Sequence, residues 1–87
     1  MTIKQTIESL AASIDTILFD CDSEQWHWEI KHVAEYALAQ LKWERDTVID
    51  VAFDFTRIIV SVYHTTGDAS DAIVGGALKR AMKNASL

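Results

Sequence analysis

Acidic residues at helical spacing are the side chains of this chain best suited to chemistry. Asp50 and Asp54 stand one helical turn apart, and Glu35 stands on the preceding stretch, which we expect to run antiparallel beside them. Facing helices that present carboxylates are how helical bundles hold Mg²⁺ or Mn²⁺. The pattern predicts a metal site made of Glu35, Asp50 and Asp54. The alternative is a solvated face on which Asp54 pairs with Arg57.

Arg57 and His64 continue the polar side of the same stretch. The polar positions follow a +4, +3 spacing that keeps one helical face polar: Asp50, Asp54, Arg57, Ser61 and His64. The pair Arg57 and His64 looks like the arginine–histidine motif of HEPN-type ribonucleases. The alternative is a histidine near a helix end, beside a polar stripe.

Aromatic side chains are concentrated in one stretch, over 24–43, which holds all three tryptophans. Tryptophan and tyrosine are favoured at subunit interfaces and in ligand clefts. We therefore expect an interaction surface formed by Trp26, Trp28, Tyr36 and Trp43. Helical spacing puts Trp26 on the inner face of this stretch, whereas Trp28, Tyr36 and Trp43 lie toward other faces. The alternative to an interaction surface is that these rings cover the ends of the bundle.

Local signals predict four helices, whose expected bounds are about 3–19, 24–43, 47–65 and 69–84. Thr2 and Gln5 have the spacing of a capping box. Asp46 and Asp68 suit the N-cap positions of the third and fourth helices. Gly67 suits a left-handed C-cap.

Apolar residues repeat at helical spacing along these segments. The first segment carries a heptad-like seam at Ile3, Ile7, Leu10, Ile14 and Ile17. The pattern predicts one all-α domain over 1–87, a four-helix antiparallel bundle. The stretch 47–65 is apolar over so much of its surface that we expect a homodimer to bury it. Gly75 and Gly76 lie inside the fourth helix, where we expect another backbone to approach closely.

Composition narrows the classes of partner. The 87 residues carry a net charge of -5, which argues against direct nucleic-acid binding and suits a basic protein surface as partner. The single cysteine, Cys21, favours a reducing compartment. We expect no signal peptide, no membrane span and a cytoplasmic protein, because no long apolar run is present.

Parts of the chain resemble a known family. The matching residues are Asp50-Val51-Ala52-Phe53-Asp54-Phe55, Arg57, Gly67-Asp68, Asp71-Ala72 and the run from Lys79 to Asn84. They resemble the second half of the all-α nucleotide pyrophosphatases, the MazG and phosphoribosyl-ATP pyrophosphohydrolase group. Lys31-His32-Val33-Ala34-Glu35 resembles the first acidic helix of that family. The resemblance, over about half of the chain, implies an oligomeric helical enzyme that uses Mg²⁺ to cleave nucleoside triphosphates to monophosphate and pyrophosphate.

The chain departs from the family pattern at positions where the family has acids. Tyr36 and Ala39 follow Glu35 at two of them, and Thr47 stands at a third. The first hypothesis is therefore a small acidic helical protein without complete catalytic machinery and without a cofactor. It would act through protein–protein interaction as a regulator or inhibitor. The alternative is a divergent Mg²⁺-dependent pyrophosphohydrolase that uses Glu35, Asp50 and Asp54.

Overall fold

The first helix begins where the sequence predicts. In the computed structural model, which describes residues 2–87, helix α1 spans Ile3–Asp20. The backbone N–H of Gln5 donates to the Thr2 hydroxyl at 3.1 Å, and the backbone N–H of Thr2 donates to Gln5 Oε1 at 2.9 Å. This reciprocal pair occupies two N–H groups that would otherwise lack partners at the helix start. The predicted capping box is therefore confirmed.

The second helix is shorter than predicted at both ends. A single 3-10 turn, η1 (Ser23–Gln25), precedes α2 (Trp26–Ala39), whereas the sequence predicted one helix over 24–43. Lys42 has a φ of 62°, in the left-handed region that a right-handed helix does not use. The helix ends before this residue, so Trp43 lies in the connection and not on α2.

The third helix ends as predicted but begins earlier. Helix α3 spans Arg45–Thr66 and is followed by Gly67, whose φ of 68° provides the predicted left-handed cap. Its N-cap residue is Glu44, which makes no capping hydrogen bond with its side chain. Asp46 therefore lies in the first helical turn, where a negative charge is favourable, and is not the N-cap that the sequence predicted.

The fourth helix begins later than predicted because Asp68 acts on the connection before it. Oδ1 of Asp68 accepts a hydrogen bond from the backbone N–H of Ser70 at 2.9 Å, which is the local turn that aspartate favours. Ser70 is the residue that precedes α4, which spans Asp71–Asn84. The chain from Gly67 to Ser70 is consequently irregular.

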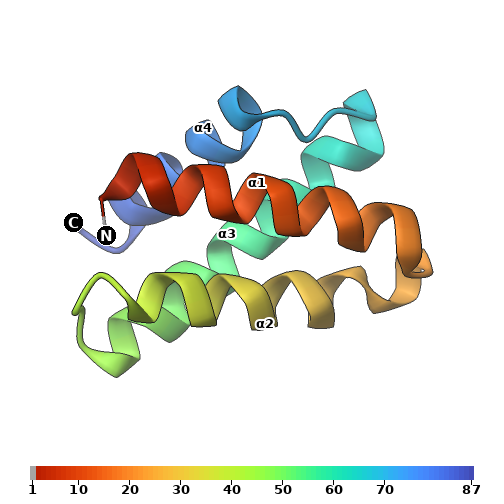
Figure 1. The fold of residues 1–87 in the computed structure, drawn as a ribbon. Helices are drawn as coiled ribbons and strands as arrows, with labels where there is room; N and C mark the ends of the chain where they lie inside the picture. Colours follow the sequence, from red (N-terminus) through yellow and green to blue (C-terminus); the bar gives the residue numbers. More distant parts are fainter. Residues whose placement is uncertain (1) are drawn as a thin grey trace.

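The described chain is all-helical, as predicted. Figure 1 shows α1 and α2 side by side and antiparallel, with α3 crossing obliquely behind them. The packed helix pairs are α1–α2, α2–α3, α3–α4 and α1–α4. Helix α4 returns along α3 and reaches the first half of α1, where Gly75 approaches the side chain of Ile7.

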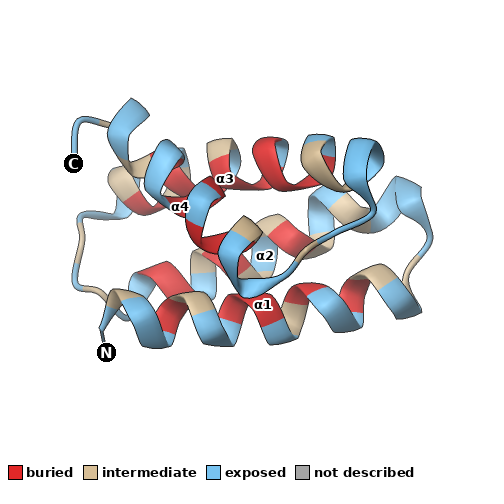
Figure 2. Ribbon diagram, turned by 90° about the horizontal axis from the view of Figure 1, so that it is seen from above, coloured by how far each residue is buried: buried red, intermediate tan, exposed pale blue. Residues whose placement is uncertain are grey.

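The buried residues of all four helices form one core, and Figure 2 shows them on the facing sides of the helices. Phe55 of α3 is the largest fully buried side chain. In the predicted seam of α1, the buried members are Leu10, Ile14 and Ile17, whereas Ile3 and Ile7 are half-buried. Burial of these side chains supplies most of the favourable free energy of folding.

Helix α3 finds most of its apolar cover within one chain. Eight of its residues are buried: Val48, Val51, Ala52, Phe55, Thr56, Ile58, Ile59 and Val60. Packing between α2 and α4 covers them, and Phe53 is its only large apolar side chain left exposed. The sequence predicted a homodimer because the stretch 47–65 is so apolar. Burial of α3 does not require a second copy, so that reason for a dimer does not hold. Within residues 2–87, no helix is both long enough and apolar enough to cross a membrane.

Candidate interaction surface

Asp54 is held by two neighbouring side chains. Its Oδ1 accepts a hydrogen bond from Arg57 Nη2 at 2.7 Å, and its Oδ2 accepts one from Asn84 Nδ2 at 2.6 Å. These bonds, the Asn84 bond foremost, lower the pKa of Asp54 below the ordinary carboxyl value. Both carboxylate oxygens already face donors, so a metal ion would have to displace them.

Glu35 lies apart from the two aspartates predicted to join it in a metal site. It forms a salt bridge with Lys31 at 3.3 Å and lines a groove between α2 and α3. Asp50 and Asp54 line a different groove, between α3 and α4. The predicted set does not converge, because the face of α3 that carries the aspartates turns toward α4. Within residues 2–87, no group of three His, Cys, Asp or Glu side chains could hold a metal ion.

Arg57 and His64 contact different partners. Arg57 reaches back to Asp54, whereas the ring of His64 lies 5.4 Å, between centroids, from the ring of Trp26. The two residues are about 10 Å apart along the helix axis, at about 1.5 Å per residue. They belong to the predicted polar stripe, of which Asp50, Arg57, Ser61 and His64 are exposed and Asp54 is half-buried.

Trp26 ties the start of α2 to the end of α3. Its indole N–H donates to the backbone carbonyl of Cys21 at 3.0 Å, and its ring meets the ring of Tyr63 edge to face, with centroids 5.2 Å apart. The side chain is half-buried and packs against the core. These contacts give Trp26 a structural role within the chain. Trp43 is likewise half-buried against the core, in the connection after α2.

The other two predicted aromatic residues are exposed on the outer side of α2. Trp28 is 69% exposed and Tyr36 is 75% exposed. His32 lies between them in sequence, and its ring centroid is 6.2 Å from that of Trp28. The three residues follow one another at intervals of one turn, and we call them the aromatic stripe.

Two features flank the aromatic stripe. On one side, the Lys31–Glu35 salt bridge runs parallel to it along α2. On the other side, His32 and Tyr36 border a shallow pocket between α1 and α2, lined also by Ser9 and Ser13. The stripe thus combines apolar rings with hydrogen-bonding groups, which is the composition of protein–protein contact surfaces.

His32 is a member that the sequence prediction missed. The spacing of 28, 32 and 36 was visible in the sequence, and it could have grouped the three rings on one helix face. Phe19 and Phe53, which are 90% and 61% exposed, were also not predicted as surface residues.

Cys21 is unsuited to nucleophilic chemistry. Desolvation by burial raises the pKa of its thiol, and the nearby carboxylates of Glu29, Asp20 and Asp22 raise it further. A raised pKa leaves little thiolate, which is the reactive form.

Comparisons with protein-family models, with curated proteins and with solved structures find no match for this chain. Its resemblance to the all-α nucleotide pyrophosphatases stays a prediction that rests on its own residues.

Proposed function

We propose that this protein is a small helical binding protein that acts through protein–protein contacts, as a regulator or inhibitor, and that pairs with a second copy through the aromatic stripe of α2. The observation that carries the proposal is the exposure of this stripe, in which two large rings, Trp28 and Tyr36, lie mostly in water. Exposed aromatic residues add little to the stability of a single chain, whereas rings of this kind dominate the binding energy at interfaces.

The stripe is complementary to itself. If two α2 helices meet antiparallel about a two-fold axis near His32, then Trp28 of each copy faces Tyr36 of the other. The same operation brings Lys31 of each copy toward Glu35 of the other, because these residues flank the stripe on one side. Aromatic packing at the centre with charge pairs at the rim is the usual arrangement of a stable interface.

Sedimentation velocity tests the pairing through a matched set of variants. We expect the wild type to sediment as a dimer and the double variant Trp28→Ala/Tyr36→Ala as a monomer with an unchanged helical circular dichroism spectrum. The expected loss of affinity is about thirtyfold or more, because an aromatic ring that is an interface hot spot contributes about 2 kcal/mol or more. Phe53→Ala is the control, since it removes a similarly exposed ring from α3 and should leave the dimer intact.

Two results would contradict the proposal. A wild-type protein that stays monomeric at the highest workable concentration would remove the pairing. Pyrophosphate release from nucleoside triphosphates with Mg²⁺, abolished by Asp54→Asn, would replace the binding function by the alternative, a Mg²⁺-dependent pyrophosphohydrolase.

A further inference from the structure

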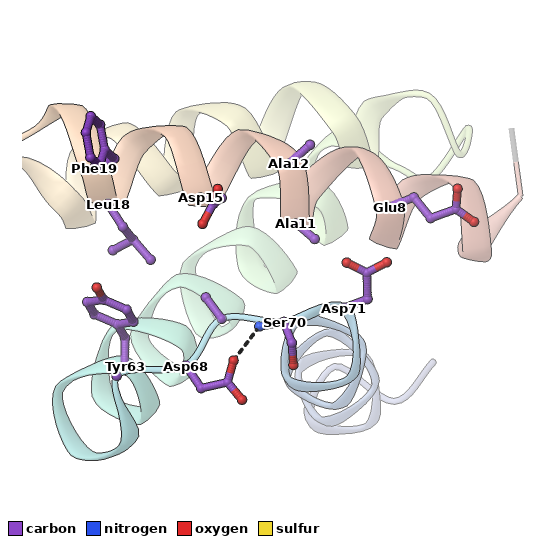
Figure 3. Close-up of a pocket in the computed structure, with 12 residues that line it drawn as sticks. Glu8, Ala11, Ala12, Asp15, Leu18, Phe19, Tyr63, Asp68, Ser70 and Asp71 are labelled. Carbon is purple, nitrogen blue, oxygen red and sulfur yellow. Dashed lines mark hydrogen bonds between the residues drawn. The ribbon is translucent and has the colours of Figure 1, made fainter.

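The fold brings together two segments that lack positively charged side chains. Residues 5–30 and 58–78 hold eight acidic residues and no lysine or arginine, so all eight lysines and arginines lie elsewhere in the chain. The two segments meet where the second half of α1 faces the end of α3 and the α3–α4 connection (Figures 1 and 3). Four of the eight acidic residues lie at this meeting point: Glu8, Asp15, Asp68 and Asp71.

A groove of about 590 Å³ lies at this meeting point. It is open because α4 begins only at Asp71, so an irregular connection and not a helix faces the second half of α1. Apolar or partly apolar side chains lie along the groove, among them Ala11, Leu18, Tyr63 and Ala69. Four carboxylates border it, those of Glu8, Asp15, Asp68 and Asp71. Figure 3 shows Asp15 and Asp71 directed into the space between α1 and the start of α4.

The carboxylates of α1 have no structural partner in the described chain. The ion pairs within residues 2–87 are Lys31–Glu35 and Arg57–Asp54, and neither lies at the groove. Asp68 and Asp71 have local roles, because the first bonds to Ser70 and the second lies in the first turn of α4. Glu8 and Asp15, in contrast, belong to neither ion pair.

We propose that this groove is the docking site for a helical segment of a partner protein, with lysine or arginine on its flanks and small apolar residues at its centre. The inference rests on the proposed binding function and adds a second surface, distinct from the aromatic stripe. Its basis is charge complementarity: four carboxylates border a groove whose lining is only partly apolar, so a helix with cationic flanks and an apolar strip matches both features.

The dimensions of the α1 face fit such a segment. Glu8 and Asp15 are two turns apart, or about 10 Å at about 1.5 Å per residue, so they match cations at positions i and i+7 of a docked helix. The small side chains of Ala11 and Ala12 lie between them and permit close approach.

A designed peptide provides the probe. It has about 14 residues, patterned as an amphipathic helix of about 21 Å, with Arg at i and i+7 and with Ala and Leu between them, and its binding is followed by fluorescence anisotropy. We expect Glu8→Gln/Asp15→Asn to weaken binding by roughly five- to tenfold, as two lost ion pairs imply. The control Glu44→Gln/Asp46→Asn removes the same charge from exposed residues away from the groove and should change the affinity less than about twofold.

Several outcomes would overturn the proposal. Absence of peptide binding would do so, and equal weakening in both double variants would show attraction to net charge alone. Competition by spermidine at the same concentration as the peptide would assign the groove to a small polyamine. A Glu8→Gln/Asp15→Asn variant that is monomeric under conditions where the wild type is a dimer would assign the groove to a second copy.

The Trp28→Ala/Tyr36→Ala variant separates this inference from the proposed pairing. If this variant is monomeric and binds the peptide like the wild type, both proposals hold. If the wild type is already monomeric but binds the peptide at the groove, the pairing fails and the docking site stands. If the dimer forms as proposed but no protein binds the peptide, the docking site fails alone.

Discussion

Asp54 links two helices through a single carboxylate. One oxygen accepts from Arg57 of its own helix, and the other accepts from Asn84 at the end of α4. The second bond spans 30 positions of the sequence, so it fixes tertiary structure and not only helix α3. The lowered pKa of Asp54 records the same fact, because donors that prefer the ionised carboxylate stabilise it in the folded state.

The pH dependence of stability should therefore carry a contribution from Asp54. A folded-state pKa below the unfolded value of about 3.9 means that this contribution is fully present above that value. It is lost as the pH falls through the folded-state pKa. We expect Asp54→Asn to lower the free energy of unfolding at pH about 7 by about 1 kcal/mol, and the difference from wild type to shrink in strong acid.

Urea denaturation over a series of pH values would measure this difference. Asp50→Asn is the matched control, since Asp50 is exposed one turn earlier on α3, and its effect should be small at every pH. A difference between wild type and Asp54→Asn that grew on acidification would contradict the assignment.

At the scale of the element, helix α4 contains two glycines whose surroundings differ. A Cβ on Gly76 would meet nothing within 4 Å, whereas one on Gly75 would lie 3.4 Å from Ile7 Cδ1. The close neighbour is a side chain of α1 and not the backbone that the sequence predicted. An alanine methyl group at Gly75 makes an ordinary contact, but a larger side chain has no room.

We expect alanine at either glycine to raise the free energy of unfolding by roughly 0.5–1 kcal/mol, because glycine is a poor helix former. Leucine should separate the two positions. Gly75→Leu should destabilise by about 1–3 kcal/mol through overpacking against Ile7, whereas Gly76→Leu should be tolerated on the exposed side. Thermal unfolding of the four variants measures this, and equal effects of leucine at both positions would contradict the packing described.

The sequence predicted the ends of helices correctly where a local signal determines them. The capping box at Thr2 and the left-handed Gly67 depend on contacts within a few residues, so the pattern was sufficient. The predicted end of α2 was wrong because apolar and aromatic residues continue as far as Trp43, while the break depends on the left-handed backbone of Lys42. Lysine gives no sequence signal for that conformation.

The candidate surfaces were only partly readable from the sequence. Helical spacing placed Trp28 and Tyr36 outside the inner face of their helix, and the structure leaves both exposed. Spacing alone did not show that Glu35 and Asp54 line different grooves, because that depends on which side of α3 packs against α2. The acidic groove was beyond prediction, since its residues come from two segments more than 40 positions apart in sequence, such as Asp15 and Asp68.

At the scale of the whole molecule, many of the acidic residues lie in segments of the chain that hold no lysine or arginine. The segments that meet at the groove hold eight of the 13 acidic residues, and the rest of the chain holds every lysine and arginine. Like charges held close together repel, and this repulsion opposes the compact state. The arrangement therefore reduces stability in the isolated protein, and a cationic partner docked in the groove would relieve the repulsion.

Salt should relieve the same repulsion without a partner. Raising NaCl from about 0.01 M to about 0.1 M shortens the screening length from about 30 Å to about 10 Å, which weakens repulsion among the carboxylates around the groove. We expect the Tm to rise by roughly 2–4 °C, as about 0.5 kcal/mol would produce in a domain of this size. Differential scanning calorimetry at one fixed protein concentration would measure the rise.

Glu8→Gln/Asp15→Asn should start from a higher Tm in low salt and respond less to NaCl, whereas Glu44→Gln/Asp46→Asn should respond like the wild type. A Tm that falls with salt would mean that attractive ion pairs elsewhere outweigh the repulsion at the groove.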